Sequence, residues 1–519
     1  MLIIITFIIL FLSALTLLVL RLFNPGFRYS WLLAVTGAFL AWISVLFWQL
    51  DMPLVLTLPS WQPTVLFPAS PLFLADQLSW AYAFSLATLG LGALLTAVAR
   101  DNFPNSPAWA GTLALSGVGI LAVLAENPLT LLLAWTAIDL AELITLLGSV
   151  QEKGLRERVV VSFATRVAGS GFLLWAGLVS TAEGTSLNFV AAPKEAGFYM
   201  LIAAGLRLGI LPIHLPFRTE SSLRRGYGTV LRLTSAAASL ILLARIPYNS
   251  LQSPLIPYIL GLISIAALYS SWMWFQATES LDARPYWLLG MASLALAATL
   301  RANPSGSVAW GTALILGGGV LFLSSLQNKW LNHLILLGLF SMSSLPMTLT
   351  AMGWESNVSS WWGFWFLLLP AHGLLLAGYF RHARRTKAEN FKTQNQLSRL
   401  IYPSGIGIML LALLLLGVWG WQGASSIGAW RFGLGSILLV TILIRLLPRI
   451  RALNPSQAHW LKPDTEKNRN LISNVFWGLY YFLRNLVRQI TNIFESDGGI
   501  LWALLFIILF ASLLSEGIR

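Results

Sequence analysis

The chain has 519 residues, of which 57% are hydrophobic and 10% are charged, and it carries a formal net charge of +13 with a mean hydropathy of +0.73. Because soluble domains carry about 25% charged residues, this composition excludes an ordinary soluble domain and indicates a polytopic membrane protein. The chain has no cysteine, which excludes disulfides, thiolate-bound zinc and protein-held iron–sulfur clusters.

Apolar stretches of about the 20 residues that a bilayer requires recur along the whole chain. They predict an all-α polytopic membrane protein with about 16 transmembrane helices. The first stretch lacks a basic segment and a cleavage site, so we expect a retained helix rather than a signal peptide. The predicted spans are 1–22, 30–50, 78–99, 108–125, 129–150, 159–182, 196–214, 228–247, 254–275, 285–300, 306–327, 331–352, 359–380, 402–421, 428–447 and 498–515.

Four consecutive spans carry ionisable residues. The fifth holds Asp139 and Glu142, whose spacing of three places both carboxylates on one helical face. The sixth, seventh and eighth spans each add one arginine, at Arg166, Arg207 and Arg232. Since a charge at the centre of a membrane helix costs about 2.5–3.5 kcal/mol even on lenient scales, such residues are candidates for a functional site. The set could pass protons between neighbouring groups, or it could be a static set of ion pairs that orients the helices.

Two spans contain helix-breaking prolines. Pro212 lies near the end of the seventh span, and Pro346 lies in the twelfth between serines and threonines. Proline removes a helical hydrogen bond, and unpaired backbone at membrane depth is tolerated only where it is buried in protein or lines a cavity. Interrupted helices in corresponding halves of a chain indicate a transporter built from inverted repeats.

The longest connection ends in a segment with helical periodicity of apolar residues. Over about 468–496 these residues recur every three or four positions. This pattern predicts an amphipathic helix in the cytoplasmic interface, or one that packs on the bundle of the chain itself.

Positive charge is divided unevenly between alternate connections. One side holds only Lys194, Arg245, Arg301, Arg431 and Arg519, and all of the other basic residues outside the spans lie on the opposite side. By the positive-inside rule, both termini are expected on the non-cytoplasmic side. The charge therefore reports topology, and no nucleic-acid partner is expected.

Several stretches resemble one family in their order and spacing: LADQLSW at 74–80, NPLTLLLAW at 127–135, FATRVAGSGFLLWAG at 163–177, AGLRLGILPIHLPF at 204–217 and VLRLTSAAASLILLAR at 230–245. Together with the broken twelfth span, they resemble the antiporter-like membrane subunits of respiratory complex I. The same family includes subunits of Mrp-type cation/proton antiporters and of membrane-bound hydrogenases. The C-terminal part resembles the distal type of subunit, which bears a lateral helix.

The resemblance implies two inverted five-helix repeats, formed by spans 4–8 and 9–13, with discontinuous helices 7 and 12. It divides the chain into an N-terminal three-helix segment at 1–105, repeats at 106–250 and 251–400, and C-terminal helices at 401–519. The implied partners are other hydrophobic subunits, the lipid bilayer, and protons or monovalent cations. The implied location is a bacterial inner or thylakoid membrane.

The resemblance also implies a proton or ion pathway along the middle of the membrane. Its residues here would be Asp139, Glu142, Arg166, Arg207, His214, Arg232 and Glu355. We expect no cofactor, no metal site and no catalytic centre, so any redox chemistry would belong to the partners in an assembly related to NADH- or ferredoxin:quinone oxidoreductases.

Three positions depart from the family pattern. Thr136 replaces a glutamate, a residue at about Gly318 replaces a lysine, and Arg207 replaces a lysine. Guanidinium keeps its proton in proteins, so Arg207 cannot carry protons as a lysine does. A non-pumping structural paralogue therefore remains an alternative, as does a stand-alone cation/proton antiporter.

A polytopic lipid-linked enzyme is a more distant alternative. The outer connections disfavour it because they offer no paired acids with a base, only Asp51, Glu126, Glu183 and Glu195 in separate places.

Overall fold

The computed structural model describes residues 2–59, 70–100, 106–150, 153–214, 223, 225–356, 364–385, 389–391 and 394–453. One compact unit runs from Met1 to Leu443, and a second begins at Ile444. All seven predicted pathway residues belong to the first unit. The predicted amphipathic segment at 468–496 and the sixteenth predicted span at 498–515 lie outside the described residues.

The described residues form fifteen α-helices, and each coincides with one of the first fifteen predicted spans. Ten of the helices are long and apolar enough to cross a membrane, which confirms an all-α polytopic membrane protein. The helices are α1 Leu2–Phe23, α2 Ser30–Asp51, α3 Gln77–Thr96, α4 Ser106–Leu124, α5 Pro128–Ser149, α6 Lys153–Ala182, α7 Lys194–Leu208, α8 Tyr227–Ala244, α9 Ile256–Gln276, α10 Arg284–Leu300, α11 Pro304–Leu323, α12 Lys329–Ser341, α13 Trp365–Ala383, α14 Gln396–Trp419 and α15 Trp430–Leu453.

Short strands and 3-10 turns join some of the helices. Strands β1 Leu54–Thr57 and β2 Leu72–Ala75 pair antiparallel before α3. Strands β3 Leu326–Gln327 and β4 Glu389–Asn390 form a parallel pair. A 3-10 turn, η5, covers Ala351–Trp354.

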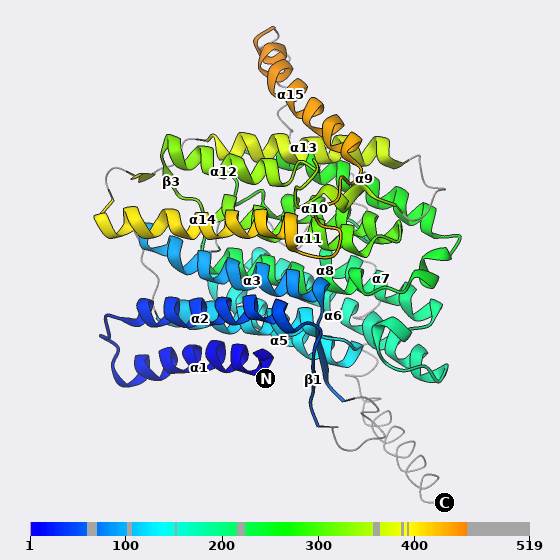
Figure 1. The fold of residues 1–519 in the computed structure, drawn as a ribbon, viewed down its shortest axis with the longest axis horizontal. Helices are drawn as coiled ribbons and strands as arrows, with labels where there is room; N and C mark the ends of the chain where they lie inside the picture. Colours follow the sequence, from blue (N-terminus) through cyan, green and yellow to red (C-terminus); the bar gives the residue numbers. More distant parts are fainter. Residues whose placement is uncertain are drawn as a thin grey trace, which may run out of the picture. The chain divides into compact units, whose positions relative to one another are not determined.

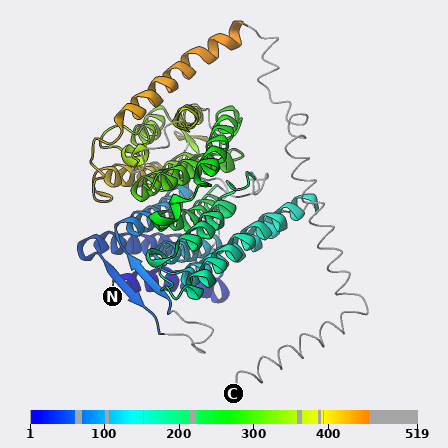
Figure 2. The ribbon, with the colours of Figure 1, turned by 90° about the vertical axis from the view of Figure 1, so that its right-hand side faces the viewer.

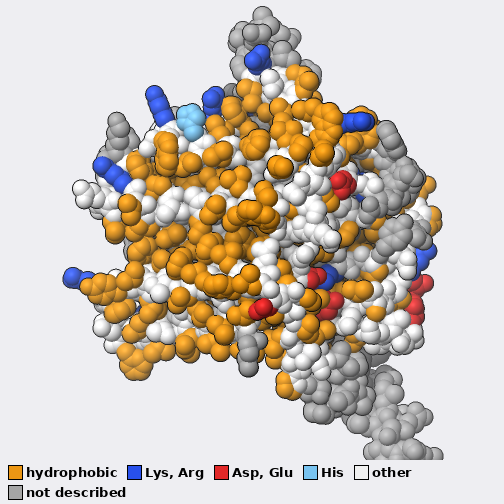
Figure 3. Space-filling view, in the orientation of Figure 1, with side chains coloured by type: hydrophobic (Ala, Val, Ile, Leu, Met, Phe, Trp, Pro, Cys, Tyr) orange, Lys and Arg blue, Asp and Glu red, His pale blue; other side chains and the backbone are white. Residues whose placement is uncertain are grey.

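Helices α3, α8 and α11 are the most buried of the ten long apolar helices, and they lie in the middle of the unit that ends at Leu443 (Figure 1; Figure 2). Every residue of α11 from Gly306 to Leu323 is buried, which fits a sequence without any charged residue. Arg225 joins α8 to α11, because its Nη1 donates to the carbonyls of Phe322 at 2.8 Å and Ser324 at 3.0 Å. Hydrophobic side chains cover most of the face shown in Figure 3, as expected for a surface in contact with lipid or other apolar helices.

The seventh and twelfth helices are short. Helix α7 has 15 residues and α12 has 13, which gives lengths of about 22 and 20 Å at 1.5 Å per residue. The hydrocarbon core is about 30 Å thick, so neither helix crosses it alone. Both predicted spans are therefore interrupted, α7 before Pro212 and α12 before Pro346.

The ends of both helices have unusual backbone. Helix α7 ends at Leu208, and Gly209 caps it with a left-handed φ of 76° that glycine adopts without strain. After α12, Ser344 and Met347 both have φ of 59°, a conformation that costs non-glycine residues about 1–3 kcal/mol. The surrounding packing must hold this second break in place.

Candidate functional site

The candidate site is built on one face of α5. Trp135, Asp139 and Glu142 are buried there, at spacings of four and three residues that place them on one side of the helix. Thr136 is exposed, and its hydroxyl donates to the carbonyl of Leu132 at 2.8 Å. The position where the resembled family has a glutamate therefore points away from this face, and the acids of this chain lie on it.

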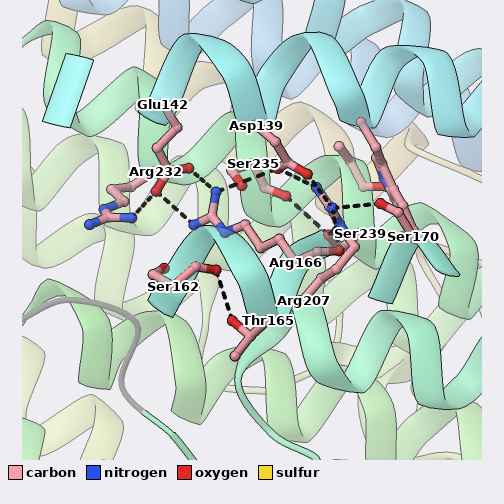
Figure 4. Close-up of polar contacts among 12 residues, drawn as sticks. Asp139, Glu142, Ser162, Thr165, Arg166, Ser170, Arg207, Arg232, Ser235 and Ser239 are labelled. Atoms are coloured by element: carbon pink, nitrogen blue, oxygen red, sulfur yellow. Dashed lines mark hydrogen bonds and ion pairs between the residues drawn. The ribbon is translucent and has the colours of Figure 1, made fainter. Parts of the chain in front are cut away.

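Arg207, in the last turn of α7, forms a two-pronged ion pair with Asp139. Its Nη1 and Nη2 lie 2.6 and 2.7 Å from the two carboxylate oxygens (Figure 4). Its Nε donates to Ser239 of α8 at 3.3 Å, and its guanidinium carbon lies 4.1 Å from the ring centre of Trp135. Only 1% of the Arg207 side chain and 4% of the Asp139 side chain are exposed.

Glu142 lies between two arginines. Arg166 of α6 bonds to both carboxylate oxygens, with Nη2 to Oε1 at 2.7 Å, and Arg232 of α8 donates to the same Oε1 (Figure 4). Nη1 of Arg166 also lies 3.6 Å from Oδ1 of Asp139. Arg166 thus connects the two acids, and α5, α6, α7 and α8 are joined by one buried network.

Close packing of α6 against α7 places Arg207. A Cβ on Gly169 would lie 2.7 Å from Cγ of Arg207 and 3.0 Å from the carbonyl oxygen of Ala203. The aliphatic stem of the arginine therefore occupies the space that glycine leaves open. Ser170 also lies within 3.4 Å of Nη1 of Arg207.

A small cavity of about 40 Å³ adjoins the network. It is lined by all three arginines together with His214 and Ser235, and α10 closes it with Pro285, Leu288 and Leu289. A volume of about 10–15 Å³ suffices for one water molecule in a polar cavity. The cavity therefore has room for water between His214 and the ion pairs.

The other predicted site residue lies apart from this network. Glu355 caps η5, and partial burial raises the pKa of its carboxyl. Among the described residues, no ion pair involves Glu355. The structure thus brings six of the seven predicted pathway residues together and leaves Glu355 outside the group.

The structure explains why no long side chain is present at Gly318, near the position where a lysine was expected. A Cβ on Gly318 would lie 2.8 Å from Nε1 of Trp287 of α10, and this indole donates to the carbonyl of Leu314 at 3.1 Å. The Trp287 ring occupies the space beside Gly318, so a long side chain there would have to displace it.

The structure contains a second group of charged residues that the sequence did not predict. Arg245, after α8, lies 2.9 Å from Asp76 and 3.3 Å from Glu126. Asp76 and Glu126 thus share one guanidinium, although the sequence keeps the acids of the outer connections apart. Because guanidinium keeps its proton, Arg245 is not a base that could serve a catalytic pair of acids. Asp76 belongs to the capping box of α3 and Glu126 to the α4–α5 connection, so the fold joins residues that the sequence keeps far apart. Burial raises the pKa of Glu126, Arg245 opposes this rise and Asp76 adds to it.

Within the described part of the chain, no group of three or more histidine, aspartate or glutamate side chains is arranged to hold a metal ion. The site offers acids, guanidinium groups and an adjoining cavity, a set of groups that can couple charges and bind protons.

No protein-family model matches the sequence, and no curated protein matches it. A solved structure is similar, the Mrp complex from Dietzia sp. DQ12-45-1b, with a TM-score of 0.73 at 14% sequence identity. The match covers 100% of this chain and 63% of the other chain, so this chain spans less than two thirds of the length of the chain it matches. The likeness shows a shared membrane fold.

Proposed function

We propose that this chain is an antiporter-like membrane subunit of a multisubunit membrane assembly, and that its first repeat, α4–α8, carries a proton or monovalent-cation pathway. The observation that carries the proposal is the buried network around Asp139 and Glu142 at the interruption of α7. Ionisable groups at membrane depth are costly and mark ion pathways and proton relays. The similar structure belongs to an Mrp complex, which supports a role beside other membrane subunits.

The mechanism we propose is charge coupling through Arg166. This arginine is bonded to Glu142, while its Nη1 is 3.6 Å from Asp139. A proton that binds to Glu142 removes the negative charge that holds Arg166, which then moves toward Asp139 because the opposite charge there attracts it. Loss of that proton restores the first arrangement. A charge change in a neighbouring subunit would favour one arrangement over the other.

The second candidate is a structural subunit that does not pump. One observation favours it: between Asp282 and Glu389 the only acidic residue is Glu355, so the second predicted repeat, α9–α13, has no carboxylate within its helices. The arginine–carboxylate pairs of the first repeat would then be permanent, and they would orient the helices without moving.

Glu142→Gln separates the two candidates. In membrane vesicles that carry the native assembly, a pathway subunit should lose most of its proton or cation flux while the partners still copurify. The matched control is Glu183→Gln, which neutralises an exposed acid just after α6. If Glu142→Gln impairs copurification with the partners and leaves flux per assembled complex unchanged, the chain is a scaffold. Purification of the wild-type chain as a fully active monomer would contradict the multisubunit assembly.

A further inference from the structure

The second predicted repeat contains a buried histidine at the interruption of α12. His372 lies near the middle of α13 and has no exposed surface. Its Nε2 is 3.0 Å from the carbonyl oxygen of Met342, the C-cap of α12, and its Nδ1 is 2.7 Å from the hydroxyl of Ser436 of α15. The ring therefore joins three helices at the break.

The hydrogen bonds of His372 allow two protonation states. The carbonyl of Met342 only accepts, so Nε2 must carry a hydrogen. The hydroxyl of Ser436 also lies 2.9 Å from the carbonyl of Phe432, and its single hydrogen can point either to that carbonyl or to Nδ1. If it points to Nδ1, the imidazole is neutral. If it points to Phe432, Nδ1 must itself donate, and the ring is an imidazolium.

The change between these states needs only a rotation of one hydroxyl. A proton adds to the lone pair of Nδ1, and the hydrogen of Ser436 turns from Nδ1 to the carbonyl of Phe432. Loss of the proton reverses both steps. Every polar atom of the ring has a partner in both states, so neither state strands a buried donor or acceptor.

The surroundings of the ring contain few charges. Trp310 of α11 and Trp354 of η5 pack on it, with ring centres at 4.8 and 5.8 Å. The charged residues nearest in sequence to these two tryptophans are Arg301, the C-cap of α10, whose guanidinium lies over Trp354 at 5.6 Å, and Glu355, which follows η5. The other elements that contact the ring carry Lys329 and His333 on α12, Arg381 and His382 on α13, and Arg431 on α15. Among the described residues, no ion pair involves His372.

The packing of α15 fixes this arrangement. A Cβ on Gly433 would lie 2.4 Å from the carbonyl oxygen of Ser344, so α15 contacts the backbone of the break directly. Because Ser436 follows on the same helix by nearly one turn, a movement of the break and the position of the hydroxyl are coupled.

We propose that His372 is the proton-binding site of the second repeat, with Ser436 as the positioning residue that accommodates both of its states. The inference rests on the proposed function, because it assigns a proton site to a half of the chain whose helices contain no carboxylate. It gives the interrupted α12 a protonatable partner on α13, as the network on α5–α8 does for α7.

The first experiment measures proton flux in vesicles that carry the native assembly. We expect His372→Gln, which can still donate to Met342 but cannot bind a proton, to lower flux by about tenfold or more, equivalent to at least 1.4 kcal/mol in barrier, with normal copurification of partners. The matched control is His382→Gln, a buried histidine on the same helix that bonds to the Trp274 carbonyl at 3.3 Å. Equal flux in the two variants would overturn the inference.

Substitutions of Ser436 test the proposal through the pH dependence of flux, which would not shift if His372 had only a structural role. Ser436→Ala removes the acceptor of the imidazolium, so the pH dependence of flux should shift to lower pH. Ser436→Thr keeps a hydroxyl and should keep the wild-type profile. An unshifted profile in Ser436→Ala would contradict the assignment.

A flux-independent measurement uses assembly labelled with nitrogen-15 in its histidines. The signal that disappears in His372→Gln should change from a neutral ring to an imidazolium on acidification. A neutral ring down to the lowest pH at which the assembly stays folded would overturn the proposal. If flux falls in Glu142→Gln but not in His372→Gln, this inference fails and the proposed function stands. If neither variant changes flux, the proposed function fails as well.

Discussion

Substitution of Arg207 tests whether the ion pair with Asp139 holds the network together. Arg207→Ala removes the two hydrogen bonds at 2.6 and 2.7 Å and leaves a buried carboxylate. Removing one partner of a buried pair costs about 3–5 kcal/mol. We expect the lower end of that range, because Nη1 of Arg166 is 3.6 Å from Asp139 and can approach it.

Two further variants divide this loss into its parts. Arg207→Lys keeps the charge but loses the second hydrogen bond and the stacking on Trp135, so it should cost roughly 1–2 kcal/mol. The double change Arg207→Met with Asp139→Leu removes both charges and leaves no stranded group, so it should destabilise less than Arg207→Ala alone.

The assay is the free energy of unfolding in mixed detergent micelles, followed by tryptophan fluorescence. A cycle of the Arg207→Met and Asp139→Leu single and double variants gives the coupling energy between the two side chains. Strictly additive losses in this cycle, or a loss below about 1 kcal/mol for Arg207→Ala, as for a surface pair, would refute the argument that this ion pair is a fixed and buried counter-charge.

Two other predictions concern packing and pH. Gly169→Ala should displace Arg207 and destabilise the chain, because the new Cβ would lie 2.7 Å from the arginine stem. The control is Gly171→Ala on the same helix, which should be neutral because no atom lies within 4 Å of a Cβ there. Equal unfolding temperatures of the two variants would contradict this prediction. The pKa of the Glu126 carboxyl is raised in the folded chain, so the folded chain binds a proton at Glu126 more tightly than the unfolded chain does. The stability that this proton contributes is lost as pH rises from the ordinary pKa of 4.5 through the raised pKa of the folded chain. The unfolding temperature of Glu126→Gln relative to wild type should therefore increase between about pH 4 and pH 7, and a constant difference would count against this assignment.

The sequence predicted the helices well because their signal is local. Uninterrupted apolar runs of bilayer length and the prolines at 212 and 346 depend on nearby residues alone, and the described helices follow them. Asp139 and Glu142 could be placed on one face for the same reason, since their spacing of three residues decides it.

Contacts between distant segments could not be read in this way. The pairing of Arg245 with Asp76 and Glu126 joins three connections, and no local pattern marks it. His372 carried no signal either, because a lone histidine on an apolar helix has no meaning until Met342 and Ser436 are placed beside it. The residue type at Thr136 indicated only that an expected glutamate is replaced. The packing of α5 was needed to show that this position faces outward.

The two halves of the bundle differ in the kind of group that can hold a proton. Near the interruption of α7, the proton-binding groups are carboxylates that form ion pairs with guanidinium groups. Near the interruption of α12, the proton-binding group is one imidazole that is hydrogen-bonded to a carbonyl and a hydroxyl. Helix α11 lies at the centre of the bundle and has no titratable residue from Pro304 to Leu323, so its side chains offer no proton relay between the halves. Electrostatic or mechanical coupling between the halves would not need such a relay. The bonds of Arg225 to the carbonyls of Phe322 and Ser324 supply a mechanical link, because they tie α8, which carries Arg232, to the end of α11.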